Sequence, residues 1–302
     1  MKKILFIIFS LTFLTGCNNY SEKNNLFAIA QLPTPVLYTS DFKNVFGGQD
    51  GSTLKLDEYG EIDELEFIAL PGTVFDITDT IHIDPKITIY QVTTPEYPYE
   101  TEKGYYIDSR FVKTSEEKPP QRKIDLPPTD QIISNLIVAE GQEYTWGGNY
   151  FQGIPELLTW YPSQHELDHT LTSQWILQGV DCSGLLYQAT NGYTPRNTSL
   201  LLNFGNAIEI ENKSQTDIIA SLQPLDLIVW DGHVIIVLNN QEIIESRLDY
   251  DKTTDGMQGG VRRRPITEVF TELLNDKIPV NDYQDPNKTE SKRFVIRRWI
   301  RE

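Results

Sequence analysis

The chain has 302 residues, a net charge of −17 and 39% hydrophobic residues. This length suffices for two ordinary domains, each with its own hydrophobic core. The negative charge opposes binding to nucleic acid and to anionic lipid head groups. We therefore expect a partner that is neutral, cationic or zwitterionic.

Residues 1–16 are typical of a signal peptide, because Lys2-Lys3 precedes an apolar run that is short for a permanent membrane helix. The run ends in Leu14-Thr15-Gly16-Cys17, which resembles a lipobox, in which the cysteine becomes the acylated first residue of a bacterial lipoprotein. The alternative is cleavage nearby that leaves Cys17 unmodified. The only other cysteine is Cys182, and since the two have separate roles, no disulfide is expected.

A lipid on Cys17 would hold the protein at a membrane surface of the cell envelope. Asn18 stands where aspartate is associated with inner-membrane retention. In a Gram-negative cell we therefore expect anchoring in the outer membrane, facing the periplasm. Residues 17–26 are polar and predict a tether between the lipid and the fold.

Residues 27–113 consist of short β-type runs separated by turn signals, which predicts a small all-β domain. Two of its segments, Leu70–Phe75 and Gly104–Val112, resemble the opening and closing strands of a bacterial SH3-type barrel. We therefore expect an SH3-like β domain. Residues 114–128 contain two Pro-Pro pairs and predict a stiff linker.

A second domain is expected over residues 129–302. Thr129-Asp130 can cap a helix that runs to Ala139, and a further helix is expected from Cys182 to about Thr190. The pattern then changes to strands, which are expected at residues 225–230, 233–237, 241–246 and 293–300. A helical part followed by a sheet part predicts an α+β fold.

Cys182 lies in the tetrapeptide Asp181-Cys182-Ser183-Gly184, directly before an apolar helical run. Asp181 is a good N-cap, so the thiol would lie in the first helical turn, where the positive end of the helix dipole stabilises a thiolate. A cysteine hydrolase also needs a base and a polar group that orients the base. The alternative is that Cys182 is a small buried hydrophobic residue.

The histidines that could act as the base are His82, His165, His169 and His233. His233 follows the turn Asp231-Gly232 and begins an expected strand, where it can face a cleft. A three-residue loop at 238–240 would pair position 237 with 241 and place Glu245 opposite His233. A two-residue loop would instead turn Glu245 to the other face. The alternative for His233 is a satisfied surface or core histidine.

Cys182, His233 and Glu245, with spacings of 51 and 12 residues, resemble the NlpC/P60 family of cell-wall cysteine peptidases. The resemblance extends to Tyr144–Gly148 and Thr194–Ser199 and covers about residues 130 to 265. It implies a papain-like α+β catalytic domain that hydrolyses peptidoglycan stem peptides, commonly at the bond from γ-D-glutamate to a diamino acid. It implies neither a cofactor nor a metal.

The resemblance also implies roles for individual residues. Cys182 would be the nucleophile, His233 the general base and later acid, and Glu245 the group that orients the imidazole. The backbone amide of Cys182, with the phenol of Tyr144 nearby, would stabilise the oxyanion.

In relatives with SH3-type domains, residues that flank the cysteine help to hold the free amino group of the stem's L-alanine. Asp181 and Ser183 match these positions, and Trp146 matches an aromatic residue of the pocket wall. The SH3-like domain would then cap one end of the groove and favour stems with a free amino terminus. We expect a monomer whose partners are stem peptides and, through Cys17, a membrane.

Two features depart from the family pattern. Residues 149–180 form an insertion where many relatives have far fewer residues, and an insertion there can serve as a lid or a groove wall. Leu225 occupies a position where glycine is usual, a change that we expect to alter only a turn.

Within the insertion, His165-Glu166-Leu167-Asp168-His169 satisfies the H-E-x-x-H pattern of zinc metallopeptidases, in which both histidines bind the metal and the glutamate is the base. A third ligand would be needed, and the flanking residues lack the apolar periodicity of a buried helix. This favours a solvated loop or a short helix. A further alternative to an active peptidase is a non-catalytic lipoprotein that binds wall peptides.

Overall fold

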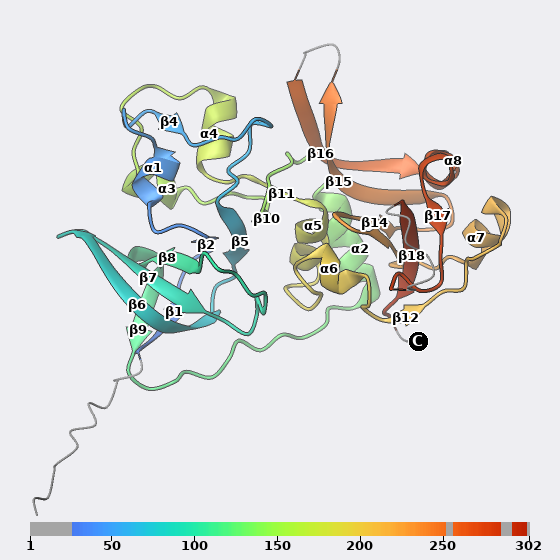
Figure 1. Cartoon of the computed structure of the whole chain (residues 1–302), viewed down its shortest axis with the longest axis horizontal. Coiled ribbons are helices and arrows are strands. Elements are labelled where there is room, and N and C mark those ends of the chain that lie inside the picture. The colour runs from blue at the N-terminus through green and yellow to red at the C-terminus, as the bar shows by residue number, and fades with distance from the viewer. Residues whose placement is uncertain (1–25, 252–255, 285–291, 301–302) are drawn as a thin grey trace, which may run out of the picture.

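The computed structural model describes residues 26–251, 256–284 and 292–300 (Figure 1). The predicted signal peptide, Cys17 and all of the tether except Leu26 lie outside these residues. Within the described ranges, no helix has the length and apolarity required to cross a membrane.

The N-terminal half is built on one curled antiparallel sheet of seven strands, in the order β5-β2-β8-β7-β6-β1-β9 (Figure 1). These strands are β1 (Leu26–Ala30), β2 (Thr34–Leu37), β5 (Leu65–Ala69), β6 (Val74–Asp84), β7 (Ile87–Thr93), β8 (Tyr105–Asp108) and β9 (Val112–Ser115). The short elements α1 (Phe42–Val45), β3 (Phe46–Gly47) and β4 (Thr53–Leu54) lie between β2 and β5. The sheet is a curled half-barrel, and its SH3-like character stays a prediction.

The expected closing strand at Gly104–Val112 is interrupted in the structure. The 3-10 turn η1 (Ser109–Phe111) separates β8 from β9, because the side chain of Asp108 accepts a hydrogen bond from the backbone N–H of Arg110 and caps the turn. The interruption lets β9 leave β8 and pair with β1 at the other edge of the sheet.

The C-terminal half has the expected α+β composition. Its main sheet is antiparallel in the order β12-β18-β13-β14-β15-β16, with β17 paired to β18 in parallel. The strands are β12 (Asn206–Ala207), β13 (Leu227–Trp230), β14 (His233–Val237), β15 (Glu242–Asp251), β16 (Gly256–Pro265), β17 (Ile278–Pro279) and β18 (Arg293–Arg298). The helices are α2 (Thr129–Val138), α5 (Cys182–Ala189), α6 (Thr198–Leu201), α7 (Gln215–Ser221) and α8 (Ile266–Asp276).

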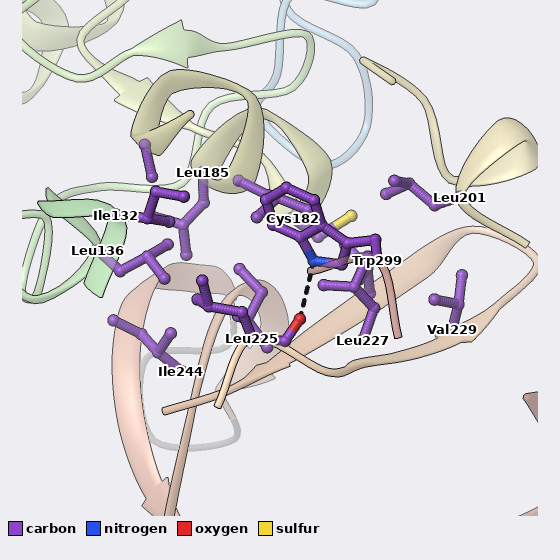
Figure 2. Close-up of a cluster of buried hydrophobic side chains, with 14 of the residues drawn as sticks. Ile132, Leu136, Cys182, Leu185, Leu201, Leu225, Leu227, Val229, Ile244 and Trp299 are labelled. Carbon is purple, nitrogen blue, oxygen red and sulfur yellow. Dashed lines mark hydrogen bonds between the residues drawn. The ribbon is translucent and has the colours of Figure 1, made fainter. Parts of the chain in front are cut away.

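Helices cover both faces of this sheet. One face packs on α2, α5 and α6, in the cluster of Figure 2 that includes Cys182, and the other face packs on α7 and α8. This arrangement explains why the sequence of β14 is apolar at every position after its first residue: Val234 and Ile236 face one layer, whereas Ile235 and Val237 face the other.

Leu225 has a φ of 68°, which is the left-handed region that glycine adopts without strain. The strain is compensated because its N–H donates to the carbonyl of Val237 at 2.7 Å and its own carbonyl accepts from Nε1 of Trp299 at 2.8 Å (Figure 2). Leucine in place of glycine therefore changes the residue in this turn but not the backbone conformation of the turn.

The insertion, residues 149–180, does not project as a free lid. It is closed at its base by the pairing of β10 (Asn149–Tyr150) with β11 (Gly179–Val180), and it contains α3 (Glu156–Trp160) and α4 (His169–Trp175). Its large side chains join the core of the N-terminal half. The shared cluster includes Leu157, Tyr161 and Trp175 from the insertion and Phe42, Phe46 and Phe111 from the N-terminal half.

Side chains of Asn149 and Arg122 are among those that tie the halves together. The buried amide of Asn149 pairs with the backbone of Ile68 in β5, accepting from its N–H at 2.9 Å and donating to its carbonyl at 2.8 Å. In the linker, Arg122 bonds Glu96 of the N-terminal half at 2.8 Å and the carbonyl of Asn191 at 3.1 Å. The predicted stiff linker is thus attached to both halves.

Candidate active site

Cys182 is the first residue of α5, as the cap at Asp181 predicts. The carboxylate of Asp181 accepts from the N–H of Gly184 at 2.7 Å, which begins the helix at the cysteine. Gly184 is required because a Cβ there would lie 1.9 Å from the carbonyl oxygen of Gly148. The thiol is 7% exposed, and Sγ lies 3.8 Å from the carbonyl oxygen of Gly232, next to His233.

His233 and Glu245 are in contact, with Nε2 and Oε2 2.8 Å apart. The predicted register is wrong by two residues: Val237 pairs with Ile243, and the three-residue loop occupies 239–241. The loop moved because the side chain of Asn239 accepts from the N–H of Gln241 and of Glu242. An even shift keeps Glu245 on the same face as His233, so the contact forms diagonally.

The charge state of His233 follows from its two polar neighbours. Burial lowers its pKa, but hydrogen bonds to Cys182 and Glu245, and the negative charges of both, outweigh this and raise the pKa to about 9. Burial raises the pKa of Glu245, yet the bond to His233 and the nearby positive charges bring it below its ordinary value. The site therefore favours an imidazolium held by a carboxylate at neutral pH.

The second oxygen of Glu245 faces two arginines from β16. Oε1 is buried and has no hydrogen-bond partner, whereas Nη1 of Arg264 lies 3.5 Å away and Nε of Arg262 lies 3.8 Å away. Arg264 is itself paired with Glu268 and Glu272 of α8. The positive charge near Glu245 lowers the cost of burying a carboxylate.

Tyr144 lies between two cavities. One, of about 580 Å³, contains Glu61, and the other, of about 450 Å³, contains His233, and Tyr144 lines both. Burial and the negative charges of Asp181 and Cys182 raise the pKa of Tyr144 above its ordinary value. The phenol therefore stays protonated and can donate a hydrogen bond near the thiol.

Asp181 and Ser183 are both bound by the buried Arg196. Its guanidinium contacts the two carboxylate oxygens of Asp181 at 2.6 and 3.0 Å and donates to Oγ of Ser183 at 2.9 Å. The positive charge of Arg196 weakens the case for Asp181 as the sole partner of a substrate ammonium. The pairing of Arg196 with Asp181 instead fixes the start of α5.

Trp146, which was expected in the pocket wall, lines neither of these two cavities and is half exposed; its backbone N–H donates to Glu61 of the N-terminal half. Gly147 has a φ of 67°, and a Cβ there would lie 2.3 Å from the carbonyl oxygen of Leu65. The Trp-Gly-Gly segment therefore permits the chain to approach the N-terminal sheet closely.

Glu61 is a site residue that the sequence did not reveal. It belongs to the N-terminal half, and its Oε2 accepts from the N–H of Trp146 at 2.8 Å. Burial raises the pKa of Glu61 to about 7, the Trp146 hydrogen bond opposes this, and the charges of Asp57, Asp181 and Glu143 add to it. In the sequence Glu61 is marked only by the preceding turn Tyr59-Gly60, which does not indicate that it lies near Asp181, 120 residues further along the chain.

The H-E-x-x-H segment does not form the helix that a zinc metallopeptidase needs. Helix α4 begins at His169, capped by Asp168, whereas His165 and Glu166 lie in irregular chain before it. Among the described residues there is no group of three or more His, Cys, Asp or Glu that could hold a metal ion. His169 lines the Glu61 cavity.

Comparison with solved structures finds distant likenesses. An NlpC/P60 family protein from Bacillus cereus is 17% identical, with a TM-score of 0.32 over 92% of this chain and 64% of that one. RipD of Mycobacterium tuberculosis, described as a non-catalytic NlpC/p60 domain protein adapted to peptidoglycan binding, is 16% identical, with a TM-score of 0.32 over 59% of this chain and 99% of that one. The chain thus spans about two thirds of the length of the Bacillus protein.

No curated protein matches the chain. Residues 1–18 match the model of the prokaryotic membrane lipoprotein lipid attachment site. The acceptor Cys17 lies within this match, although it is outside the described residues. The match supports a lipid-anchored protein of the cell envelope.

Proposed function

We propose that this protein is a cysteine endopeptidase of the NlpC/P60 type that hydrolyses peptidoglycan stem peptides at the bond from γ-D-glutamate to the diamino acid. The observation that carries the proposal is that three groups are brought together in sequence of contact. Cys182 lies at a helix N-terminus, the imidazole of His233 lies beside it, and Glu245 holds that imidazole at 2.8 Å.

In the proposed reaction, the thiolate of Cys182 attacks the γ-carbonyl carbon of the glutamate, and a C–S bond forms. The oxyanion accepts hydrogen bonds from the backbone N–H of Cys182 and the phenol of Tyr144. His233 then gives its proton to the departing amine of the diamino acid, and the C–N bond breaks. Water, which loses a proton to His233, attacks the thioester carbonyl; the C–S bond breaks, and the thiolate and the imidazolium are restored.

We further propose a preference for stems with a free amino terminus. The Glu61 cavity supports it, since a partly buried carboxylate and a protonated phenol line the same space, and the phenol is close enough to Cys182 for the two charges to interact. An ammonium is the group that such a carboxylate would bind most strongly. This assigns recognition mainly to Glu61 and Tyr144, with Asp181 adding negative charge that Arg196 partly offsets.

The test uses the synthetic tripeptide L-Ala-γ-D-Glu-diaminopimelate and mass analysis of the products. The wild-type protein should release the dipeptide and free diaminopimelate, and Cys182→Ala should abolish hydrolysis while it keeps peptide binding. Iodoacetamide should stop the reaction, and EDTA should leave the rate unchanged. Unchanged turnover in Cys182→Ala, or loss of activity with EDTA, would refute the proposed mechanism.

A further inference from the structure

The cavity of about 450 Å³ that contains His233 has no role in the proposal so far. It shares Tyr144 with the Glu61 cavity but is lined by residues around the base, among them Trp230, Gly232 and Arg247. Since His233 has to protonate the departing amine, the leaving group must lie on the side of the site that His233 lines. The Glu61 cavity is then left for the acyl part of the stem.

The charges that line this cavity differ from those of the protein as a whole. The chain carries a net charge of −17, yet the ionised side chains that line the cavity are four cations, with the imidazolium of His233 among them, and two carboxylates. Lys277 is paired with Asp276 at 2.8 Å, and Arg264 is paired with Glu272. The charges of these two pairs cancel, and the imidazolium of His233 is balanced by Glu245, so the charge that remains is that of Arg247.

Arg247 is available for a ligand. Among the described residues its carboxylate partner is Asp249, which lies outside the cavity lining and contacts the inner nitrogen, Nε, at 2.6 Å. The side chain is 41% exposed. Because Arg247 follows Glu245 by two residues in β15, it lies on the face of the sheet that carries His233. Its outer nitrogens can therefore form the paired hydrogen bonds that suit a carboxylate.

We propose that this cavity is the leaving-group subsite and that Arg247 binds a carboxylate at the far end of the third stem residue. Diaminopimelate carries a carboxylate and an ammonium at that end, whereas lysine carries only an ammonium. The aliphatic part would lie along Trp230, which lines the cavity. The enzyme should therefore discriminate in favour of diaminopimelate, an inference that rests on the proposed function.

The experiment compares kcat/KM for L-Ala-γ-D-Glu-diaminopimelate and L-Ala-γ-D-Glu-L-Lys. The wild-type protein should prefer the diaminopimelate peptide by about tenfold or more, the range of one charge-assisted hydrogen bond. Arg247→Gln should bring the ratio close to one, and Arg247→Glu should reverse it. The ratio is the decisive quantity, because Arg247 also acts on the charge of Glu245 and a change there affects both substrates equally.

Arg263→Gln is the matched control. Arg263 is the neighbouring cation of β16, is paired with Glu140 and Glu242, and does not line the cavity, so its loss should leave the ratio unchanged. Equal kcat/KM for both peptides in the wild type, or an unchanged ratio in Arg247→Gln, would overturn the subsite while the proposed function stands.

Binding to the Cys182→Ala protein separates the two proposals. Calorimetry should give a lower Kd for the diaminopimelate peptide than for the lysine peptide, and Arg247→Gln in that background should remove the difference. If the wild type hydrolyses neither peptide but this binding preference is present, the subsite holds and the proposed function fails. Equal Kd values contradict the subsite whatever the activity.

Discussion

Glu245 is a fully buried carboxylate whose two oxygens have different surroundings. One oxygen accepts the hydrogen bond of His233, and the other faces arginines at 3.5 and 3.8 Å without a hydrogen bond of its own. The carboxylate thus acts on the imidazole mainly through its negative charge and through one hydrogen bond. A substitution that removes the charge of Glu245 but keeps the shape of its side chain tests this directly.

Glu245→Gln should lower kcat/KM by about 100-fold, because the imidazolium loses its counter-charge. The raised pKa of His233 places its deprotonation, and hence the alkaline limb of the rate profile, near pH 9. The glutamine lowers that pKa, so the alkaline limb should move to lower pH. The measurement is kcat/KM from pH 5 to 10. Glu242→Gln is the control, because Glu242 is on the same strand but half exposed, and it should leave the alkaline limb in place. An unmoved limb in Glu245→Gln would contradict the role of Glu245 as the counter-charge of His233.

At the scale of elements, the insertion is part of the N-terminal core. Trp175 is fully buried at the end of α4, and its Nε1 donates to the carbonyl of Tyr161 at 2.8 Å. The ring of Tyr161 in turn stacks on Phe42 and Phe46. The insertion therefore provides apolar area that the N-terminal half needs on that side.

Trp175→Ala should reduce the free energy of unfolding by about 3–5 kcal/mol, the usual cost of emptying a large buried site. Urea unfolding followed by circular dichroism measures it. Trp146→Ala removes the same side chain from a half-exposed position and should change stability by less than about 0.5 kcal/mol. Similar losses in the two variants would mean that the insertion is not a core element.

How well the sequence predicted an element depended on whether its signal was local. The start of α5 follows from the cap at Asp181, and both the cap and the apolar run are contiguous in the sequence. Strand β16 was not expected, since Gly256–Pro265 contains three glycines and three arginines and becomes a strand only by pairing with β15. Helix α8 is not among the predicted elements, although Ile266, Val269, Phe270 and Leu273 have helical spacing.

The candidate site shows the same division between local and tertiary signals. Cys182 and His233 follow from a helix cap and a strand after a turn, and the contact of His233 with Glu245 depends only on the parity of the register. Glu61 could not be found in this way, because its role arises from the packing of one half of the molecule on the other. Asp181 was recognised, but its partner Arg196, fourteen residues beyond Cys182, was not.

At the scale of the whole molecule, the site depends on both halves, since Glu61 reaches the Cys182 region from the N-terminal half. A carboxylate with a pKa of about 7 is charged above that pH and neutral below it. An ammonium binds the charged form, so KM for a peptide with a free amino terminus should fall as the pH rises through 7.

Glu61→Gln should raise that KM by about tenfold, the range of one charge-assisted hydrogen bond, and remove its pH dependence near 7. Steady-state kinetics from pH 6 to 8 with free and N-acetylated peptides provides the measurement. The acetylated peptide has no ammonium, so its KM should be equally high in both proteins. An equal rise of KM for both peptides would point to a general distortion of the groove instead.

The hydrogen bonds of the Asn149 side-chain amide restrict how such a protein can evolve. It occupies the N–H and carbonyl of Ile68 on one side and accepts from Nε of Arg196 at 3.0 Å on the other. Arg196 in turn holds Asp181, next to the nucleophile. Recombination that replaced either half alone would leave these buried groups unpaired, each at a cost of about 1–3 kcal/mol. The two halves must therefore be inherited together, as one unit and not as exchangeable modules.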